Sequence, residues 1–200
     1  MPPPSSDIIE LVRVIGGAHR GRRLRTVEGL DVRPTSDRLR ETLFNILTSH
    51  IEESRFLDIC AGSGAIGLEA ISRGARQVTF IDNSRRACSI IEANLRALGA
   101  EDLSVIINRD AAAALKQLAQ AGEVFDIAFL DPPYASGIYH TVMRLLDERP
   151  LLSGDAIVVV EHRAKTPPEE RYGRLRMYRV VKQGESALAF YTASREEFTK

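Results

Sequence analysis

From Arg55 onward, short apolar segments alternate with amphipathic segments of helical period, and this alternation constrains the fold more than any other feature of the sequence. Such an order is typical of parallel β-strands whose connecting helices cover both faces of the sheet. Right-handed crossovers then give a doubly wound α/β fold with ligands at the carboxyl ends of the strands. The expected strands are 55–59, 77–81, 104–108, 125–130 and 156–160, the expected helices are 65–73, 84–98, 110–120 and 138–148, and a hairpin of 172–182 and 186–191 closes the chain.

A separate segment precedes the alternating region. Residues 9–15 and 22–27 are short extended patterns separated by glycines, which predicts a small β-hairpin. A helix with an N-cap at Thr35 or Ser36 and an apolar face within 39–47 is expected next. We therefore divide the 200 residues into a disordered tail (1–7), a basic N-terminal β extension (8–35) and an α/β domain (36–200).

The formal net charge is zero, but the charge is distributed unevenly. Between residues 11 and 40 there are eight arginines against three acidic residues, and His19 can add positive charge. Nucleic-acid binding needs only a local excess of positive charge, so the overall neutrality of the chain does not exclude nucleic-acid binding. The alternative is a solvated charged face without a partner. The arginines are Arg13, Arg20, Arg22, Arg23, Arg25, Arg33, Arg38 and Arg40, of which the last three are expected to border the entrance of the cleft.

Other features of the composition disfavour several classes of protein. No apolar run approaches the roughly 20 residues of a membrane-spanning helix. Residues 1–6 lack the basic and apolar regions of a secretory signal. Cys60 and Cys88 have no CxxC or histidine pairing, which indicates reduced thiols in a cytoplasmic protein without a disulfide or metal site. No apolar stripe is left over once the sheet and helices are assigned, so we expect a monomer.

A glycine-rich loop follows the first strand of the alternating region. Gly62, Gly64 and Gly67 form a GxGxxG pattern, and Asp82 ends the next strand about twenty residues later. This arrangement matches a dinucleotide site, with a pyrophosphate at the helix N-terminus and the acid on a ribose. Asp58 favours S-adenosylmethionine (SAM) instead. A carboxylate there would repel a pyrophosphate, whereas it can pair with the ammonium group of a methionine tail.

The acids that follow the next two strands fit the same cofactor. Asp82 can accept hydrogen bonds from both ribose hydroxyls, which does not separate SAM from a dinucleotide. Asp110 can accept from an adenine amino group or cap the helix that begins there, and both possibilities stay open. The predicted cofactor-binding residues are Asp58, Ala61, Gly62, Ser63, Gly64, Asp82, Asn83, Arg109 and Asp110.

The fourth strand ends in the motif Asp131-Pro132-Pro133-Tyr134. The prolines have no N–H to donate, so they stiffen the turn and leave their carbonyls free to accept. Asp131 and the Pro132 carbonyl can then accept from an exocyclic amine, while the Tyr134 ring offers a stacking face for a base. The motif therefore indicates a site that alkylates the amino group of a nucleobase. A strand end followed by an ordinary turn is the alternative.

Four stretches of the chain together resemble one known family. RVIGGAHRGRRL, RPTSDRLRETLFNIL, LDICAGSGAIGLEAISRGA and FLDPPY are similar to the bacterial small-subunit (16S) rRNA guanine-N2 methyltransferases. The resemblance runs from about Arg13 to Tyr191. DPPY also occurs in DNA adenine-N6 methyltransferases, so the discriminating part is the N-terminal stretch 13–47. The segment from Glu161 onward matches only loosely.

The resemblance implies a Rossmann-like class I SAM-dependent methyltransferase whose mostly parallel sheet has an antiparallel last strand. It also implies an N-terminal extension that contacts 16S rRNA or a small ribosomal subunit particle. The methionine end of SAM is expected near Asp58, Gly62 and Gly64. The target guanine is expected at the catalytic motif Asp131, Pro132, Pro133 and Tyr134. The expected RNA contacts are His19, Arg20, Arg22, Arg23, Arg33, Thr35 and Arg38.

Three other functions remain open on the residues alone. DPPY can hold adenine N6 in DNA or RNA as well as guanine N2, and no residue identified from the sequence separates the two bases. A non-catalytic assembly factor could retain SAM and bind RNA. An NAD-dependent oxidoreductase fits the glycine loop but leaves DPPY without a purpose.

Overall fold

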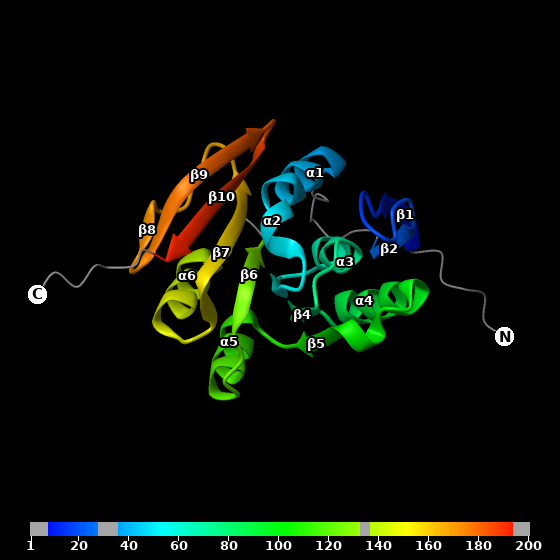
Figure 1. Ribbon diagram of the computed structural model, residues 1–200, viewed down its shortest axis with the longest axis horizontal. Coiled ribbons are helices and arrows are strands. Elements are labelled where there is room, and N and C mark those ends of the chain that lie inside the picture. Colours follow the sequence, from blue (N-terminus) through cyan, green and yellow to red (C-terminus); the bar gives the residue numbers. More distant parts are fainter. Residues whose placement is uncertain (1–7, 28–35, 133–136, 194–200) are drawn as a thin grey trace, which may run out of the picture.

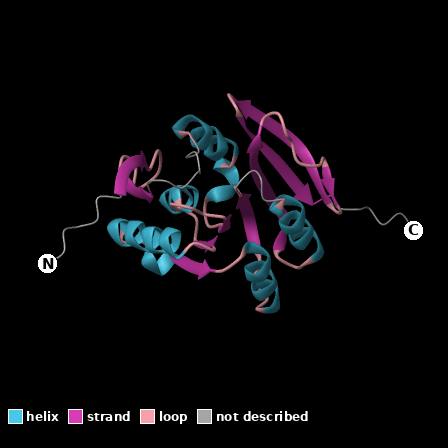
Figure 2. Ribbon diagram, turned by 180° about the vertical axis from the view of Figure 1, so that it is seen from behind, coloured by secondary structure: helices cyan, strands magenta, loops and turns pink. Residues whose placement is uncertain are grey.

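The computed structural model describes residues 8–27, 36–132 and 137–193, and Figure 1 shows their arrangement. The predicted tail at 1–7 lies outside these residues. Within them, an eight-stranded sheet of order β5-β4-β3-β6-β7-β10-β9-β8 forms the centre of the molecule, with helices on both faces (Figures 1 and 2). The strands are β3 (Arg55–Ile59), β4 (Gln77–Asp82), β5 (Ser104–Asn108), β6 (Phe125–Leu130), β7 (Leu152–Arg163), β8 (Arg171–Tyr172), β9 (Leu175–Gln183) and β10 (Ser186–Ala193).

The strand directions confirm the doubly wound fold predicted from the sequence. β5, β4, β3, β6 and β7 are parallel, and β10 is inserted antiparallel between β7 and β9. The antiparallel last strand is therefore confirmed as well. The helices are α1 (Asp37–Ile46), α2 (Thr48–Ile51), α3 (Ala65–Ser72), α4 (Arg85–Leu98), a 3₁₀ turn (Glu101–Leu103), α5 (Ala111–Gln120) and α6 (Ile138–Glu148).

Two strands differ clearly from the sequence prediction. β7 begins at Leu152 rather than at 156, because it also pairs with Phe125 at the start of β6. The expected strand 172–182 is interrupted at Gly173, which adopts a left-handed φ of 56° beside the Asp147 carboxylate. The N-cap of α1 is Ser36, one of the two residues predicted for this position, and its hydroxyl accepts from the Leu39 N–H at 3.2 Å.

The two faces of the sheet bury two apolar cores. Alternate residues of β3 and β6, such as Phe56 and Phe129, pack under α1 to α4, while Leu57 and Ala128 pack under α5 and α6. This strict alternation follows from the period of two residues in a strand. The same alternation determines on which face of the sheet each polar side chain at the end of a strand lies.

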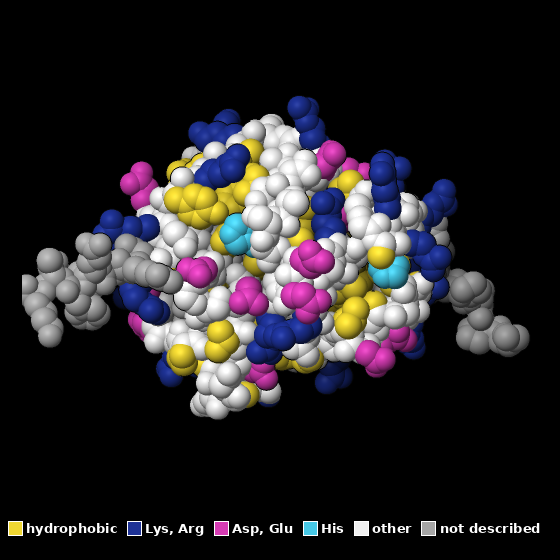
Figure 3. Space-filling model, viewed as in Figure 1, with side chains coloured by type: hydrophobic (Ala, Val, Ile, Leu, Met, Phe, Trp, Pro, Cys, Tyr) yellow, Lys and Arg dark blue, Asp and Glu magenta, His cyan; other side chains and the backbone are white. Residues whose placement is uncertain are grey.

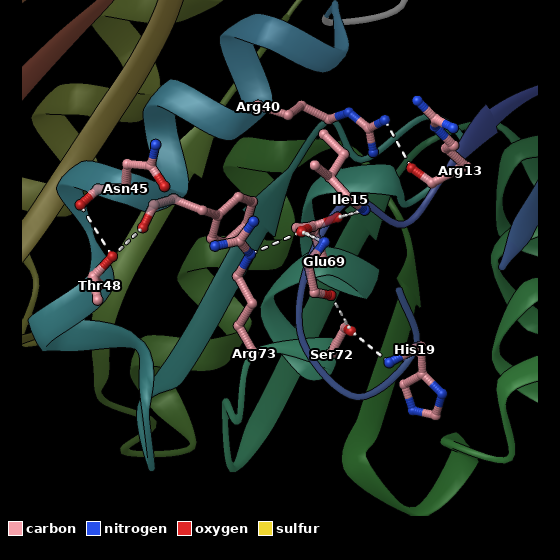
Figure 4. A network of polar contacts seen from close by, with 11 residues as sticks. Arg13, Ile15, His19, Arg40, Asn45, Thr48, Glu69, Ser72 and Arg73 are labelled. Carbon is pink, nitrogen blue, oxygen red and sulfur yellow. Dashed lines mark hydrogen bonds and ion pairs between the residues drawn. The ribbon is translucent and has the colours of Figure 1, made fainter. Parts of the chain in front are cut away.

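The N-terminal extension forms the predicted hairpin of β1 (Ile8–Arg13) and β2 (Arg23–Val27), a separate two-stranded sheet beside α3 and α4 (Figure 1). Glu69, on α3, anchors it. The buried carboxylate accepts from the Ile15 N–H at 2.7 Å, the Gly16 N–H at 2.8 Å and the Arg73 Nε at 2.7 Å (Figure 4). One side chain thus joins the extension to the α/β domain.

Ser72, also on α3, supplies the second anchor. Its hydroxyl donates to the Gly16 carbonyl at 2.6 Å and accepts from the His19 N–H at 2.9 Å. At Gly17 an added Cβ would lie 1.8 Å from the Ser72 carbonyl oxygen, so only glycine fits this turn. The loop between β1 and β2 is therefore held against α3 largely through its backbone, and Arg20 in this loop is exposed.

Replacement of Glu69 tests this anchor. Glu69→Ala leaves two backbone N–H groups and Arg73 without their acceptor, and each unsatisfied buried group costs about 1–3 kcal/mol. We expect the free energy of unfolding, measured by urea denaturation, to fall by about 2–4 kcal/mol. The control is Glu92→Ala, since Glu92 is exposed and lies 3.9 Å from Arg96; its loss should stay below about 0.5 kcal/mol. Equal losses in the two variants would contradict the anchoring role.

Candidate active site

The loop between β3 and α3 turns through three residues with left-handed backbones. These are Cys60, Gly62 and Gly64, with φ values of 63°, 57° and 76°. An added Cβ at Gly64 would lie 3.0 Å from Ile91, and one at Gly67 would lie 2.2 Å from Phe80, so these two glycines allow close packing of α3. Among the described residues other than its chain neighbours, none has an atom within 4 Å of an added Cβ at Gly62. Gly62 is therefore the glycine that faces open space, where a ligand can approach.

Asp58 lies beneath this loop and is almost fully buried, at 1% exposure. Its Oδ2 accepts from the Gly67 N–H at 2.9 Å. Burial raises the pKa of Asp58 to about 8, with a further increase from the negative charge of Asp82, while the Gly67 hydrogen bond opposes the shift. A cation beside Asp58 would favour its ionised form, as the sequence prediction for this residue requires.

Asp82, at the end of β4, holds the loop from the other side. Its Oδ2 accepts from the Gly62 N–H at 2.9 Å and its Oδ1 accepts from the Ser84 N–H at 2.8 Å. Each carboxylate oxygen can accept a further hydrogen bond, so the predicted contact with ribose hydroxyls is compatible with this role. The carboxylate thus positions the loop itself.

Cys60 shows that the predicted acids converge. Burial raises the pKa of its thiol to about 12, and the negative charges of four carboxylates, from Asp82, Asp131, Asp58 and Asp110, add to the shift. These acids lie at or near the carboxyl ends of four strands and are far apart in the sequence. The thiol stays neutral, and a cationic ligand bound here would favour the ionised forms of the carboxyls.

Asp131 directly follows β6. Its N–H donates to the Ile59 carbonyl at 3.3 Å, which extends the pairing with β3 by one residue. Burial, followed by repulsion from Glu161 and from Asp58, raises the pKa of Asp131 well above its usual range. Pro132 is buried, whereas the predicted residues Pro133 and Tyr134 lie outside the described residues.

A cavity of about 60 Å³ lies between these elements. Small-molecule sites commonly occupy about 300–1,000 Å³, so this cavity can hold only part of a nucleotide-sized ligand. It opens at the carboxyl ends of β3 and β6, as expected for a doubly wound fold. Its lining is formed by Val12, Asp58, Cys60, Ala61, Gly62, Ser63, Ala65, Ile66, Phe129 and Asp131.

Three predicted cofactor-binding residues lie farther out. Asp110 caps α5, where its Oδ1 accepts from the N–H groups of Ala112 and Ala113 at 3.0 and 3.2 Å. The capping role is therefore confirmed, and Oδ2 can serve a second role. Asn83 and Arg109 are exposed at the ends of β4 and β5, and the Arg109 N–H donates to the Asp82 carbonyl at 3.1 Å.

The basic residues predicted to contact RNA are distributed over the extension and α1. Leu24 and Thr26 of β2 are buried, so Arg23 and Arg25 share the exposed face of this strand. The Arg22 guanidinium donates to the Ala97 carbonyl at 2.7 Å, which commits part of this side chain to docking. Arg33 and Thr35 lie outside the described residues. Of the other predicted contacts, Arg20 and Arg38 are exposed and His19 is half-buried.

Arg40 contradicts the sequence prediction that it borders the cleft entrance. Its side chain is fully buried, and its Nη2 donates to the Arg13 carbonyl at 2.9 Å (Figure 4). The same Nη2 donates to Asp37 at 2.8 Å. The sequence prediction had placed this side chain beside the cleft entrance. Here it joins α1 to the end of β1 instead.

Asn94, on α4, was not identified from the sequence. Its buried amide accepts from the Arg25 N–H at 2.8 Å and donates to the carbonyls of Arg25 and Ser63 at 3.0 and 3.1 Å. It therefore connects the basic extension to the glycine loop. An asparagine within an amphipathic helix carries no local signal for such a contact.

Other possible sites in the described residues are less convincing. A larger hollow, of about 350 Å³, lies between α6 and β8, but none of the converging carboxylates lines it. The described residues contain no group of three or more His, Cys, Asp or Glu that could hold a metal ion. Both cysteines are free thiols. Among the helices described, none is both long and apolar enough to cross a membrane.

Comparisons with known proteins agree with this geometry. The family described as conserved hypothetical protein 95 matches residues 12–192. Ribosomal RNA small subunit methyltransferase D of Escherichia coli is 37% identical, over 88% of this chain and 93% of the relative. The Haemophilus influenzae protein of the same name is 38% identical, over 78% of this chain and 81% of the relative.

A solved structure shares the fold. The E. coli protein yhhF, described as a candidate methyltransferase, superimposes with a TM-score of 0.81 at 34% identity, covering 92% of this chain and 99% of its own. The methyltransferase fold predicted from the sequence is therefore confirmed.

The raised pKa of Asp58 predicts a pH-dependent stability. The folded protein retains this proton at pH values where the unfolded chain, with an ordinary pKa of 3.8, has lost it. The contribution of Asp58 to the free energy of unfolding is therefore greatest below pH 3.8 and falls as the pH rises to about 8. Asp58→Asn has no such proton. Without ligand, its Tm should rise relative to the wild type between pH 5 and pH 8.

Between pH 5 and pH 8, the Tm of Asp58→Asn relative to that of the wild type should rise by at least about 2–4 °C. This rise corresponds to about 1 kcal/mol in a domain of this size. Asp102→Asn serves as the control, because Asp102 is exposed and its difference from the wild type should not vary over this pH range. A Tm difference for Asp58→Asn that is equally independent of pH would show that Asp58 is ionised in the folded protein.

Proposed function

Because this chain belongs to the family described as conserved hypothetical protein 95, which its similarity to ribosomal RNA small subunit methyltransferase D also supports, we propose that it methylates small-subunit rRNA. The specific reaction that we propose is transfer of a methyl group from SAM to the N2 amine of one guanine in 16S rRNA. The protein would act in the cytoplasm as a monomer, on the rRNA or on a small-subunit particle.

One observation carries the proposal: Asp58 and Asp131 line the same cavity, and Asp82 holds the glycine loop that forms part of its wall. SAM carries a sulfonium and an ammonium group, so an electronegative site favours it, whereas a dinucleotide pyrophosphate would be repelled. The open space at Gly62 and the small cavity beside Asp58 fit a methionine tail that enters along the glycine loop. These carboxyls thus argue for SAM as the cofactor and against the NAD-dependent alternative.

Each predicted cofactor residue then has a physical role. Asp58 pairs with the ammonium group, which returns this buried carboxyl to its ionised form. The Gly62–Gly64 turn lets the backbone approach the ligand closely. Asp82 accepts from the ribose hydroxyls while it holds the Gly62 N–H, and the remaining oxygen of Asp110 accepts from the adenine amine. Ala61, Ser63, Asn83 and Arg109 complete the proposed contacts along the ends of β3 to β5.

The target amine needs orientation more than it needs a strong base. The lone pair of guanine N2 is delocalised into the ring, so the amine is a poor nucleophile. Hydrogen bonds to Asp131 and to the Pro132 carbonyl fix the amine so that this lone pair is directed out of the plane of the purine ring. When bound, SAM supplies a methyl group that forms a bond to N2 while its bond to sulfur breaks and the electron pair remains on sulfur. The methylated amine then loses a proton readily. Positioning of this kind supplies most of the acceleration.

The extension supplies affinity for the nucleic acid. Arg20, Arg23 and Arg25 are exposed on an extension whose backbone is anchored by Glu69, Ser72 and Asn94. On the face seen in Figure 3, Lys and Arg side chains are interspersed with Asp and Glu, so no continuous basic field dominates that face. We therefore assign phosphate binding to the extension and α1, with His19, Arg22, Arg33, Thr35 and Arg38 as the further proposed contacts.

Extrusion of the target base costs a few kcal/mol in a duplex and less in a loop. Stacking on an aromatic ring contributes about 1–3 kcal/mol per base. We propose that Tyr134 provides this stacking face and that Pro133 stiffens the turn before it. A loop or bulge of the rRNA is therefore the preferred target.

Replacement of Asp131 tests the chemistry. Asp131→Ala removes the acceptor that orients the amine, so methyl transfer from labelled SAM to small ribosomal subunits should fall by about 10²-fold or more. Binding of SAM, measured by calorimetry, should persist, because Asp58, Asp82 and the glycine loop remain. Asp102→Ala, at an exposed acid, should leave both unchanged. If Asp131→Ala methylates subunits as fast as Asp102→Ala, the assignment of DPPY to the target base is wrong.

A double arginine variant tests the extension. Arg20 and Arg25 are exposed, so Arg20→Ala with Arg25→Ala removes two positive charges without removing the Arg22–Ala97 contact. The slope of log affinity for small-subunit rRNA against log salt concentration should become shallower by about 1–2. Each phosphate contact contributes about 0.7–0.9 to this slope. The matched control, Lys116→Ala with Arg149→Ala, removes the same charge elsewhere and should keep the slope of the wild type. An unchanged slope in both would exclude this RNA surface.

A further inference from the structure

A buried carboxyl next to the DPPY motif has no role in the reaction described above. Glu161, in β7, is only 2% exposed. The parallel pairing of β6 and β7 places Leu130 opposite Val160, so the next residues, Asp131 and Glu161, are opposite each other. Neighbouring strands lie about 4.8 Å apart, which brings these two side chains to adjacent positions.

The two side chains also share a face of the sheet. Phe129 and Val159 pack in the core beneath α1 to α4, whereas Leu130 and Val160 pack in the core on the other face. By the alternation of side chains, Asp131 and Glu161 lie on the face of Phe129 and Val159. Phe129 and Asp131 line the cavity that Asp58 borders. Glu161 therefore extends the row of carboxyls from Asp58 and Asp131 by one strand.

The backbone at Glu161 is firmly held. Its carbonyl accepts from the Tyr139 hydroxyl at 3.1 Å, and the residue pairs with Leu188 of the antiparallel strand β10. Its negative charge is one of the causes that raise the pKa of Asp131. Glu161 adds a second carboxyl acceptor beside that of Asp131, so a ligand that brings two adjacent hydrogen-bond donors would be bound in preference to one that brings a single donor.

The two candidate target bases differ at this point. Guanine carries the N1–H donor next to its N2 amine, so its edge presents adjacent donors. Adenine carries an N1 lone pair next to its N6 amine. An ionised carboxylate only accepts hydrogen bonds, so a second carboxylate beside the one that holds the amine is complementary to guanine and repels the adenine edge.

We propose that Glu161 is a specificity-determining residue whose carboxylate accepts the N1–H of the target guanine while Asp131 holds the N2 amine. The inference rests on the proposed function and supplies the discrimination between guanine and adenine that the DPPY motif alone does not contain. It requires that the target base enter with its N1 edge toward β7.

The experiment compares two target bases and two enzymes. Small-subunit rRNA is assembled into particles with either guanine or 2-aminopurine at the position that the wild-type enzyme methylates. 2-Aminopurine keeps the 2-amino group but has an N1 lone pair in place of the N1–H. The wild type should prefer guanine by at least about 10²-fold in kcat/KM, because the site has a hydrogen-bond acceptor that only guanine satisfies.

Glu161→Gln offers an amide N–H to that lone pair, so its preference for guanine should fall at least about tenfold, while Glu161→Asp should retain a preference for guanine. Equilibrium binding of the same particles in the presence of S-adenosylhomocysteine should show the same change in preference without turnover. A proportional loss on both bases would assign Glu161 a structural role only. Equal rates of the wild type on both bases would overturn the proposal even if Glu161→Gln does not fold.

The outcome for the proposed function is read separately. If the wild type transfers no methyl group to guanine in small-subunit rRNA, the proposed function fails. If it does so but either the wild-type preference for guanine or the change of that preference in Glu161→Gln is absent, only the role of Glu161 fails.

Discussion

The parallel register of β3, β6 and β7 determines where Asp58, Asp131 and Glu161 lie. β3 pairs with β6 so that Asp58 is opposite Phe129. β6 pairs with β7 so that Leu130 is opposite Val160, which places the next residues, Asp131 and Glu161, opposite each other. Because side chains alternate strictly along a strand, a shift of one residue in either pair would move a carboxyl to the opposite face. The apolar cores on both faces oppose such a shift, so the packing of the sheet and the chemistry of the site have one origin.

The same packing makes the site unfavourable without a ligand. Asp58 and Asp131 have raised pKa values because their carboxyls are removed from water and repel neighbouring acids. Natural folds retain such an arrangement at functional sites, where a ligand supplies the missing charge. Here a cationic cofactor would supply positive charge, and a base with two adjacent N–H donors would supply hydrogen bonds to the carboxylates. The carboxyls therefore reduce stability in the free protein, and under the proposed function they would provide selectivity in the complex.

Much of this could be predicted from sequence, because the signals are local. Apolar alternation located the strands, and the glycine loop with Asp58, Asp82 and Asp131 located the edge of the sheet. Contacts between distant segments gave no such signal. Glu69 and Asn94 belong to ordinary amphipathic helices, yet they anchor the extension. Arg40 was expected at the cleft entrance and is buried. Glu161 gained a possible role only when the register placed it opposite Asp131. Gly173 interrupts a strand that looked continuous in the apolar pattern.

The most direct test of the central claim is the identity of the methylated nucleoside. Small ribosomal subunits from cells that lack this enzyme are incubated with the protein and labelled SAM, and the rRNA is digested to nucleosides. The account predicts label in N2-methylguanosine at a single position of the 16S rRNA. Label in N6-methyladenosine would contradict the guanine assignment while keeping the cofactor site. SAM binding without transfer to any nucleic acid would contradict the enzymatic account and favour an RNA-binding factor.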